Sequence, residues 1–310
     1  MAGCVGTRKV YSELMRELLS GKFVYTAEIE AGKTSNLEKI VEKGKMLKNY
    51  VTAINVTDNP GACAHMNSLI PSYIIQRDVG VESVYQITCR DRNRLAIISD
   101  LLAAAALGIK NVLAITGDHI TLGDNPGAKP VFDLDSATLV YLIRKMVDEG
   151  VDLAGNKIEG EVRFHVGIVA NPNAVPLELE ILKIARKVEL GIDFIQTQCV
   201  FDIDLAKEFL REVRKYNIPV LIGICPVRSI GMMKWYIKEC PGGIRIPLDI
   251  QERLKNANER KGKKGVLEES IEISTELIKE LRRTTSASGA HIMAIGFEHV
   301  IPEIVKRSAQ

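Results

Sequence analysis

The chain has 310 residues, of which 46% are hydrophobic and 26% are charged, and its net charge is +2. This length and composition suffice for a large buried core, and the small net charge gives no electrostatic argument for binding nucleic acid. No apolar run reaches the roughly 18 residues of a membrane-spanning helix, and the first residues lack the apolar segment of a signal peptide. We therefore expect a soluble, cytoplasmic protein without nucleic-acid or membrane partners.

Six cysteines are spread along the chain, and none belongs to a CxxC pair. A zinc ribbon or an iron–sulfur site within this chain is therefore not expected. Cys63 and His65 have a spacing that would suit two metal ligands, but isolated pairs of this kind are usually structural. We predict no metal site, and we expect reduced thiols because the chain shows no secretory feature.

Strand and helix patterns alternate along the chain. An N-terminal helix is expected over 1–22, with Leu14, Leu18 and Leu19 on one side. Short apolar runs predict strands at 23–29, 51–57, 82–88, 110–116, 163–169, 193–198, 218–224 and 290–295. Helical periodicity predicts helices between them, at 34–49, 65–75, 137–149, 176–190, 205–215, 230–238, 266–281 and 297–305. A further, strongly apolar helix is expected to run through Leu101 to Leu107.

Local signals refine some of these elements. Ser35 and Glu38 have the spacing of a capping box, and Asp135 and Ser136 can cap the helix at 137–149. Residues 253–265, RLKNANERKGKKG, are expected to form a basic loop or helix end, with a solvated surface favoured over an anion site. The loop from residue 117 to about 130 is longer than most in α/β proteins and is a functional candidate.

The predicted strands are almost continuously apolar, which is typical of parallel strands buried on both faces. Eight right-handed strand–helix units close into a barrel. We therefore predict an α/β fold, a (β/α)8 TIM barrel with additional helices, as a single domain over 1–310 with the barrel at 23–308. The alternative is an open doubly wound sheet, but EAGKTS after the first strand matches neither of its phosphate-loop motifs.

In such a barrel, the carboxyl ends of the strands converge on one pocket. The residues at these ends are Glu28, Thr57 with Asp58, Gln86 with Thr88, 116–118, Asn171, Gln198, Pro226 and Gly296. They include no histidine cluster, no lysine suited to a Schiff base and no nucleophile with an adjacent base. The set suits a flat polar heterocycle and the transfer of a proton or hydride. Alternatively, Glu28 and Glu30 are solvated residues at a strand end.

Ordered motifs add a resemblance to these patterns. They are E-x-x-x-x-K-T-S from Glu28, V-T-D-N, Q-I-T-C-R-D-R-N, L-A-I-T-G-D, A-R-K-V-E-L-G-I-D-F-I-Q-T-Q and G-I-C-P-V. In this order and spacing, from about residue 23 to 300, the chain resembles the methylenetetrahydrofolate reductase family. These are flavin-dependent (β/α)8 barrels of one-carbon metabolism. The short catalytic subunit of acetogenic and related anaerobic bacteria is the most similar form.

The resemblance implies a role for each matching position. Glu28 matches the general acid that protonates N10 of the folate, after which hydride passes from N5 of the reduced flavin to the methylene carbon. Asp118 matches the carboxylate beside the flavin and the pterin. Gln198 matches a folate contact, and Tyr236 matches a substrate-site position where relatives place phenylalanine against NADH. The implied flavin contacts are Thr57, Gln86, Thr116, Gly117, Asp118, Ser136, Asn171, Arg186 and Lys187.

The pattern of residues alone leaves part of this open. Without the resemblance, Arg186 and Lys187 fit a solvated helix face better than a phosphate site. Gln86, Asp58 and Met232 stand where relatives often carry histidine, tyrosine and glutamine. The stretch 296–298 replaces one that supplies a folate-binding arginine in some relatives. These departures weaken the expected folate-tail contacts and argue against direct use of NADH.

We therefore expect a flavin cofactor, FAD in preference to FMN, and a folate substrate. The expected electron donor is a partner subunit that holds zinc or iron–sulfur clusters, and the family also points to a homo-oligomer. Two other functions stay open. One is a flavin-binding electron-relay subunit of a larger complex, and the other is a pterin-dependent barrel methyltransferase, which would be colourless.

Overall fold

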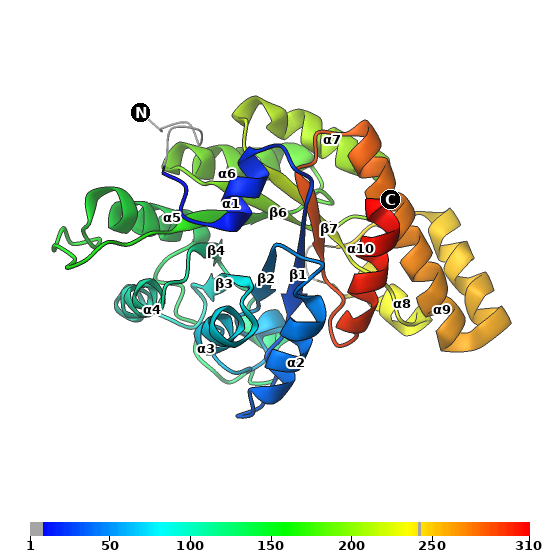
Figure 1. The fold of residues 1–310 in the computed structure, drawn as a ribbon, viewed down its shortest axis with the longest axis horizontal. Helices are drawn as coiled ribbons and strands as arrows, with labels where there is room; N and C mark the ends of the chain where they lie inside the picture. Colours follow the sequence, from blue (N-terminus) through cyan, green and yellow to red (C-terminus); the bar gives the residue numbers. More distant parts are fainter. Residues whose placement is uncertain (1–8, 241–242) are drawn as a thin grey trace.

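The computed structural model describes residues 9–240 and 243–310. Its strands are β1 Val24–Ile29, β2 Ala53–Val56, β3 Glu82–Thr88, β4 Asn111–Ile115, β5 His165–Ala170, β6 Phe194–Cys199, β7 Val220–Ile224 and β8 Gly289–Ile292. All neighbouring pairs of these strands are parallel, and the strands close into a barrel in chain order, with β8 paired to β1 (Figure 1). The predicted (β/α)8 barrel is confirmed, and the open sheet is excluded.

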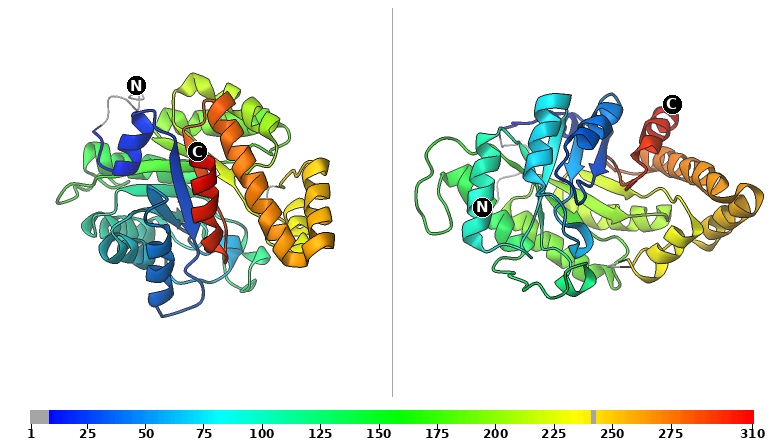
Figure 2. Two further views of the ribbon diagram at one scale, coloured as in Figure 1. Left: turned by 45° about the vertical axis from the view of Figure 1, so that its right-hand side comes forward. Right: turned by 90° about the horizontal axis from the view of Figure 1, so that it is seen from below.

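Helices lie around the barrel, and one of them, α1, covers its amino-terminal end (Figures 1 and 2). They are α1 Glu13–Leu19, α2 Glu38–Leu47, α3 Leu69–Ile74, α4 Arg94–Ala106, α5 Ser136–Arg144, α6 Leu177–Leu190, α7 Ile203–Val213, α8 Ile230–Lys238, α9 Leu248–Thr284 and α10 Ile301–Ala309. α3 and α5 each continue as one π-helical turn, Ile75–Val79 and Lys145–Glu149. No helix in the described ranges is long and apolar enough to span a membrane.

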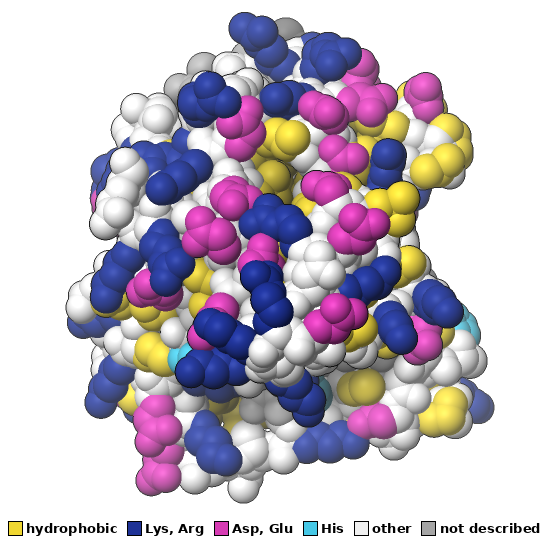
Figure 3. Space-filling view, turned by 90° about the vertical axis from the view of Figure 1, so that its right-hand side faces the viewer, with side chains coloured by type: hydrophobic (Ala, Val, Ile, Leu, Met, Phe, Trp, Pro, Cys, Tyr) yellow, Lys and Arg dark blue, Asp and Glu magenta, His cyan; other side chains and the backbone are white. Residues whose placement is uncertain are grey.

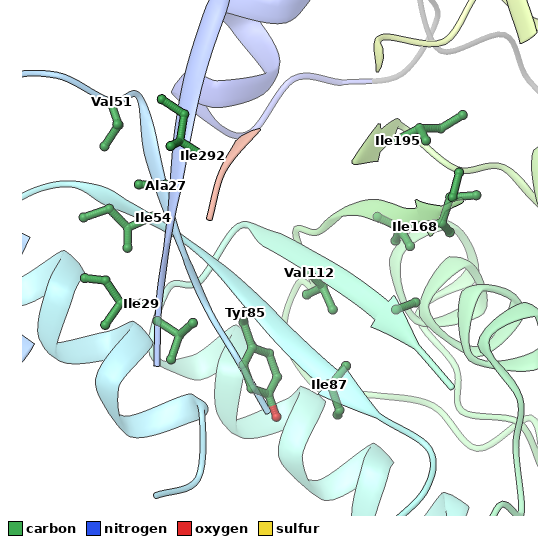
Figure 4. Packing of buried hydrophobic residues seen from close by; sticks show 14 of the residues in the cluster. Ala27, Ile29, Val51, Ile54, Tyr85, Ile87, Val112, Ile168, Ile195 and Ile292 are labelled. Atoms are coloured by element: carbon green, nitrogen blue, oxygen red, sulfur yellow. The ribbon is translucent and has the colours of Figure 1, made fainter. Parts of the chain in front are cut away.

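The apolar core has one layer outside the barrel and one inside it. Outside, side chains such as Ile54, Tyr85 and Val112 belong to the cluster that packs between strands and helices (Figure 4). Inside, a second cluster fills the amino-terminal end, where α1 contributes side chains that pack with Phe194 of β6. These apolar groups close one end of the barrel, so polar chemistry is left to the carboxyl end.

The predicted N-terminal helix is confirmed only for Glu13–Leu19, and residues 1–8 lie outside the described residues. It begins after Ser12, whose Oγ accepts a hydrogen bond from the backbone N–H of Met15 at 3.1 Å. Leu14 and Leu18 are buried as expected, but the exposed fraction of Leu19 is 41%. The grouping of all three leucines on one packed side was therefore wrong for Leu19.

The capping box at Ser35 and Glu38 is also wrong. α2 begins after Leu37, and the backbone N–H of Glu38 donates to Oδ1 of Asn36 at 2.8 Å. This local side-chain bond replaces the cap that Ser35 would have formed. At α5 the expectation holds in part, because Oδ1 of Asp135 accepts from the backbone N–H of Thr138 at 2.7 Å.

Of the two expectations for 253–265, a basic loop is wrong and a helix end holds, because these residues lie in α9 around the break that ends its first arm. The helix is broken at Gly262, where φ is 60°, and its two arms pack closely enough that a Cβ on Gly265 would lie 2.3 Å from the carbonyl oxygen of Ala257. Arg253 bonds Glu269 and Glu276 across the break. Figure 3 shows Lys and Arg interspersed with Asp and Glu on the side of the molecule where α8, α9 and α10 lie.

The expectation that all cysteines are reduced is wrong for two of them. Cys199, the last residue of β6, and Cys225, directly after β7, form a disulfide with their Cα atoms 5.5 Å apart. Cys63 and Cys89 are free among the described residues, and Cys4 lies outside them. The pairing was not foreseen because the two residues are 26 positions apart and meet only when β6 and β7 become neighbours.

Candidate active site

A cavity of about 1080 Å³ lies at the carboxyl ends of the strands. This size is close to the upper end of the range for small-molecule sites, roughly 300–1,000 Å³. Of the predicted pocket residues, Asn171, Pro226 and Gly296 do not line the cavity, and the following do: Glu28, Thr57, Gln86, Thr116, Gly117, Asp118, Ser136, Arg186, Lys187, Gln198 and Tyr236. The fold therefore brings together residues that are far apart in the sequence.

Asn171, a predicted flavin contact, is not among the residues that line the cavity. Its backbone N–H donates to Oε1 of Glu180 at 3.0 Å, and its Oδ1 accepts from the backbone N–H of Asn173 at 3.0 Å. Asn171 thereby shapes the loop after β5. Glu180, whose side chain accepts the hydrogen bond from the backbone N–H of Asn171, does line the cavity.

Glu28 is buried near the end of β1, with an exposed fraction of 8%. Its Oε2 accepts a hydrogen bond from Nε2 of Gln86 at 2.8 Å, and Nε2 of His291 lies 3.5 Å from the same oxygen. The alternative that Glu28 is a solvated residue at a strand end is therefore wrong. It faces the interior because side chains alternate along a strand, so that Thr26 and Glu28 share one face.

A buried polar network continues from Glu28 into the barrel. Nδ1 of His291 and Oγ1 of Thr26 share a hydrogen bond of 2.9 Å. Gln196 donates to the same Thr26 oxygen at 3.3 Å and exchanges two hydrogen bonds with Asn55, of 2.7 and 3.1 Å. Our sequence analysis missed His291, Gln196 and Asn55 as part of the site. Strand alternation could have found Gln196, since it lies two residues before Gln198.

Glu30, just beyond β1, also lines the cavity. Burial, and next the charge of Glu28, raise the pKa of Glu30 to about 7. The cavity therefore contains a second carboxyl group that titrates near neutral pH. The alternative that Glu30 is a solvated residue at a strand end is therefore wrong, since its side chain is partly buried.

Arg90 holds three loops of the cavity wall together, and the sequence analysis did not single it out. Its guanidinium binds Asp91 through two hydrogen bonds of 2.8 Å. It also donates to the backbone oxygens of Asn59, at 3.0 Å, and Asp118, at 3.2 Å. These contacts join the segments that follow β2, β3 and β4, and they fix the backbone at Asp118.

Gly117 is required where the chain leaves β4. Its φ is +94°, and a Cβ there would lie 3.0 Å from Cβ of Arg90, a tight contact in a strained backbone conformation. The preceding Thr116 accepts a hydrogen bond through Oγ1 from the backbone N–H of Ser136 at 3.1 Å. This bond ties the end of β4 to the start of α5.

Arg186 and Lys187 on α6 place two positive charges at the cavity. Burial lowers the pKa of Lys187, and the carboxylates of Glu180 and Asp135 partly oppose this. Burial alone would raise the pKa of Asp135, but hydrogen bonds from Thr138 and these two cations lower it. Within the described ranges, neither cation forms an ion pair, so both are available to an anionic group of a ligand.

Gln198 reaches the cavity from an irregular strand end. The register between β6 and β7 shifts between Gln196 and Cys199, as in a β-bulge. Oγ1 of Thr197 accepts from the backbone N–H of Gly223 at 2.8 Å and holds the bulge in place. Bulges of this kind re-aim side chains near active sites.

One buried hydroxyl in the wall has no protein partner. Oγ1 of Thr57 is buried and forms no hydrogen bond with any residue in the described part of the chain. Buried hydroxyl groups are normally bonded, so a polar ligand atom at this place would satisfy it. Together with Arg186 and Lys187, it gives the wall polar groups that suit a polar, anionic ligand. In residues 9–240 and 243–310 we find no group of three or more His, Cys, Asp or Glu side chains arranged to hold a metal.

Comparisons with known proteins show which family this chain belongs to. The family model described as "Methylenetetrahydrofolate reductase" matches residues 13–309. Methylenetetrahydrofolate reductase 1 of Schizosaccharomyces pombe is 25% identical over 315 residues, which cover 96% of this chain and 48% of that protein. The 5,10-methylenetetrahydrofolate reductase of Salmonella typhimurium is 24% identical over 247 residues, which cover 77% of this chain and 76% of that protein.

The chain spans about half the length of the first of these relatives. The family model, in contrast, extends over nearly the whole chain. The protein therefore belongs to the methylenetetrahydrofolate reductase family.

Proposed function

We propose that this chain reduces 5,10-methylenetetrahydrofolate to 5-methyltetrahydrofolate with a flavin bound in the cavity. The observation that carries the proposal is the place of Glu28, a buried carboxyl group in the wall of a cavity that also presents two cations, Arg186 and Lys187, without an ion-pair partner among the described residues. The relatives named above carry this activity in their names. The pocket is large enough for a tricyclic ring and a second heterocycle.

The bound flavin would supply the hydride. Thr57, Thr116 and Ser136 would hold its polar ring and chain atoms, and Arg186 and Lys187 would hold its phosphates. Two adjacent cations suit a diphosphate better than a single phosphate, which favours FAD over FMN. Gly117 lets the backbone approach the ligand without a Cβ.

Glu28 would act as the general acid that protonates N10 and opens the ring to the 5-iminium cation. The hydrogen bond from Gln86 fixes one of its oxygens and leaves the other free to face the substrate. Asp118, whose backbone Arg90 holds, would stabilise the cation with its negative charge. Gln198 would bind the pterin from the bulged end of β6.

Replacing Glu28 by Gln tests this assignment. We expect folate-dependent oxidation of the reduced flavin to fall by about 10²–10⁴-fold in single-turnover mixing, because a positioned acid contributes this much. Flavin binding should survive, since the variant keeps the shape of the side chain. Glu42→Gln, at an exposed position of α2, is the matched control. Near-full activity of Glu28→Gln would rule out the acid role.

A second candidate is a flavin-binding relay subunit that does not itself turn over folate. It is favoured by the loop after β8, where relatives supply an arginine for folate. Here Glu298 is buried, forms an ion pair with Lys43 at 2.6 Å and accepts from the backbone N–H of Gly296 at 3.3 Å. Anaerobic mixing of the oxidised flavoprotein with 5-methyltetrahydrofolate separates the two functions, because only the reductase bleaches the flavin.

The electron donor is also part of the proposal. Near the site, Met232 and Tyr236 stand where relatives often carry glutamine and phenylalanine. We therefore propose that a partner subunit with zinc or iron–sulfur clusters delivers the electrons. Stopped-flow mixing with NADH alone tests this, since fast bleaching of the flavin would exclude an obligatory donor subunit. A colourless purified protein would instead favour a pterin-dependent methyltransferase.

A further inference from the structure

The disulfide between Cys199 and Cys225 lies in the wall of the cavity. The exposed fractions of the two residues are 4% and 1%, and both line the same space as Glu28 and Gln198. A reductant therefore reaches the sulfur atoms from inside the cavity and not across the outer surface. In this respect the pair differs from a disulfide that cross-links surface loops.

The barrel does not depend on this bond to join β6 and β7. Cys199 pairs in register with Gly223, and the backbone N–H of Val200 donates to the oxygen of Gly223 at 2.9 Å. The side chain of Thr197 accepts from the N–H of the same glycine. Because these hydrogen bonds hold the strand ends together, the S–S bond can open without separating the strands.

The surroundings of the pair favour neutral thiols once the bond is open. Cys199 and Cys225 belong to an apolar cluster with Phe201, Val227 and Met233. Such surroundings disfavour a thiolate, so reduction takes up protons together with electrons.

A third cysteine does not compete with the pair. Cys240 also lines the cavity, but burial raises the pKa of its thiol to about 11. Because the thiolate is the attacking form, this thiol is a weak nucleophile toward the disulfide at neutral pH. Cys63 lines the cavity as well, and among the described cysteines it is Cys199 and Cys225 that form the disulfide.

We propose that Cys199 and Cys225 are a redox-active pair that exchanges two electrons with a dihydroflavin bound in the same cavity. The inference rests on the proposed function, which places the flavin there. In the reducing direction the S–S bond breaks, two electrons and two protons are taken up, and two thiols form. The dihydroflavin is the donor of both and becomes oxidised flavin. When fully reduced, the flavin-loaded protein would therefore hold one electron pair in the flavin and a second in the two thiols.

Counting electrons in an anaerobic dithionite titration tests this. The oxidised, flavin-loaded wild type should take up about four electrons per flavin, and the double variant C199S/C225S about two, since a disulfide is a two-electron couple. Cys240→Ser, in the same wall, is the matched control and should keep the wild-type number. A wild type that takes up about two electrons would overturn the inference.

Alkylation with a maleimide, followed by peptide mass mapping, gives a second readout that needs only the wild type. With the protein quenched in acid and unfolded before alkylation, both cysteines should resist alkylation if the flavin was oxidised and react if it was photoreduced. Flavin reduction that leaves the pair disulfide-bonded would overturn the inference and leave the proposed function intact, as would labelling of both cysteines before reduction. Protein that binds no flavin would contradict the proposed function, and with it this exchange. Reduction of the flavin-free protein by dithiothreitol would then show whether the disulfide opens from the cavity.

Discussion

Nε2 of Gln86 donates a 2.8 Å hydrogen bond to Oε2 of Glu28, across two strands that are not neighbours in the barrel. Both side chains are buried in the wall of the cavity. The bond fixes the orientation of the carboxyl group that we propose as the general acid. Gln86 is thus a positioning residue for Glu28 in addition to its predicted contact with the flavin.

We predict that Gln86→Ala slows folate-dependent flavin oxidation by roughly 10–100-fold, because a misplaced acid transfers its proton poorly. Gln86→His should keep most of the rate, since histidine retains a donor at the same place. Stopped-flow absorbance of the flavin measures both. Equal loss in the two variants would show that the hydrogen bond to Glu28 is not what matters at this position.

We predict that Glu30 makes stability depend on pH. Its pKa is raised from 4.5 to about 7 in the folded protein, so the folded state binds the proton more tightly than the unfolded state does. This contribution is fully present below the unfolded pKa and is lost as the pH rises toward the folded value. Glu30→Gln should therefore be more stable than the wild type at pH 8, by about 2 kcal/mol after discounting for partial exposure to solvent.

Urea unfolding of the wild type, Glu30→Gln and the control Glu42→Gln at pH 5 and pH 8 measures this effect. The difference between wild type and Glu30→Gln should grow with pH, while Glu42→Gln should follow the wild type. A difference that is the same at both pH values would mean that burial does not perturb Glu30.

We predict that Arg186→Ala and Lys187→Ala weaken the binding of flavin nucleotides. Loss of one charged hydrogen bond of about 1.5–3 kcal/mol corresponds to roughly 10–100-fold in affinity. Fluorescence titration with FAD and with riboflavin separates the causes, because riboflavin carries no phosphate and its affinity should not change. Lys279→Ala, at an exposed position of α9, is the control. An equal loss for riboflavin would contradict a phosphate-binding role.

We predict that Gly167→Ala destabilises the barrel. A Cβ at this position of β5 would lie 2.3 Å from the ring of Phe194, which fills the barrel interior. Overpacking of this kind costs roughly 1–3 kcal/mol in the free energy of unfolding. Gly127→Ala, where a Cβ meets nothing within 4 Å, should change stability by less than about 0.5 kcal/mol. Similar unfolding midpoints for both variants would show that Phe194 moves aside easily.

The sequence by itself determined the barrel and the end at which its polar groups gather. The bounds predicted for β3 and α8 are those of the structure, because alternation along a strand and periodicity along a helix are local properties. The same alternation places Glu28 at the inner face of β1. The order and spacing of the motifs along the chain then pointed to the family.

Only the tertiary structure decided which of these groups meet. The hydrogen bond between Gln86 and Glu28, the approach of His291 and the disulfide of Cys199 with Cys225 each join segments that are distant in the chain. The two packed arms of α9 depend in the same way on contacts across Gly262, which local composition does not reveal. Side chains become buried and meet their partners only when the strands close into a barrel. The raised pKa of Glu30 and the disulfide between Cys199 and Cys225 therefore depend on that closure.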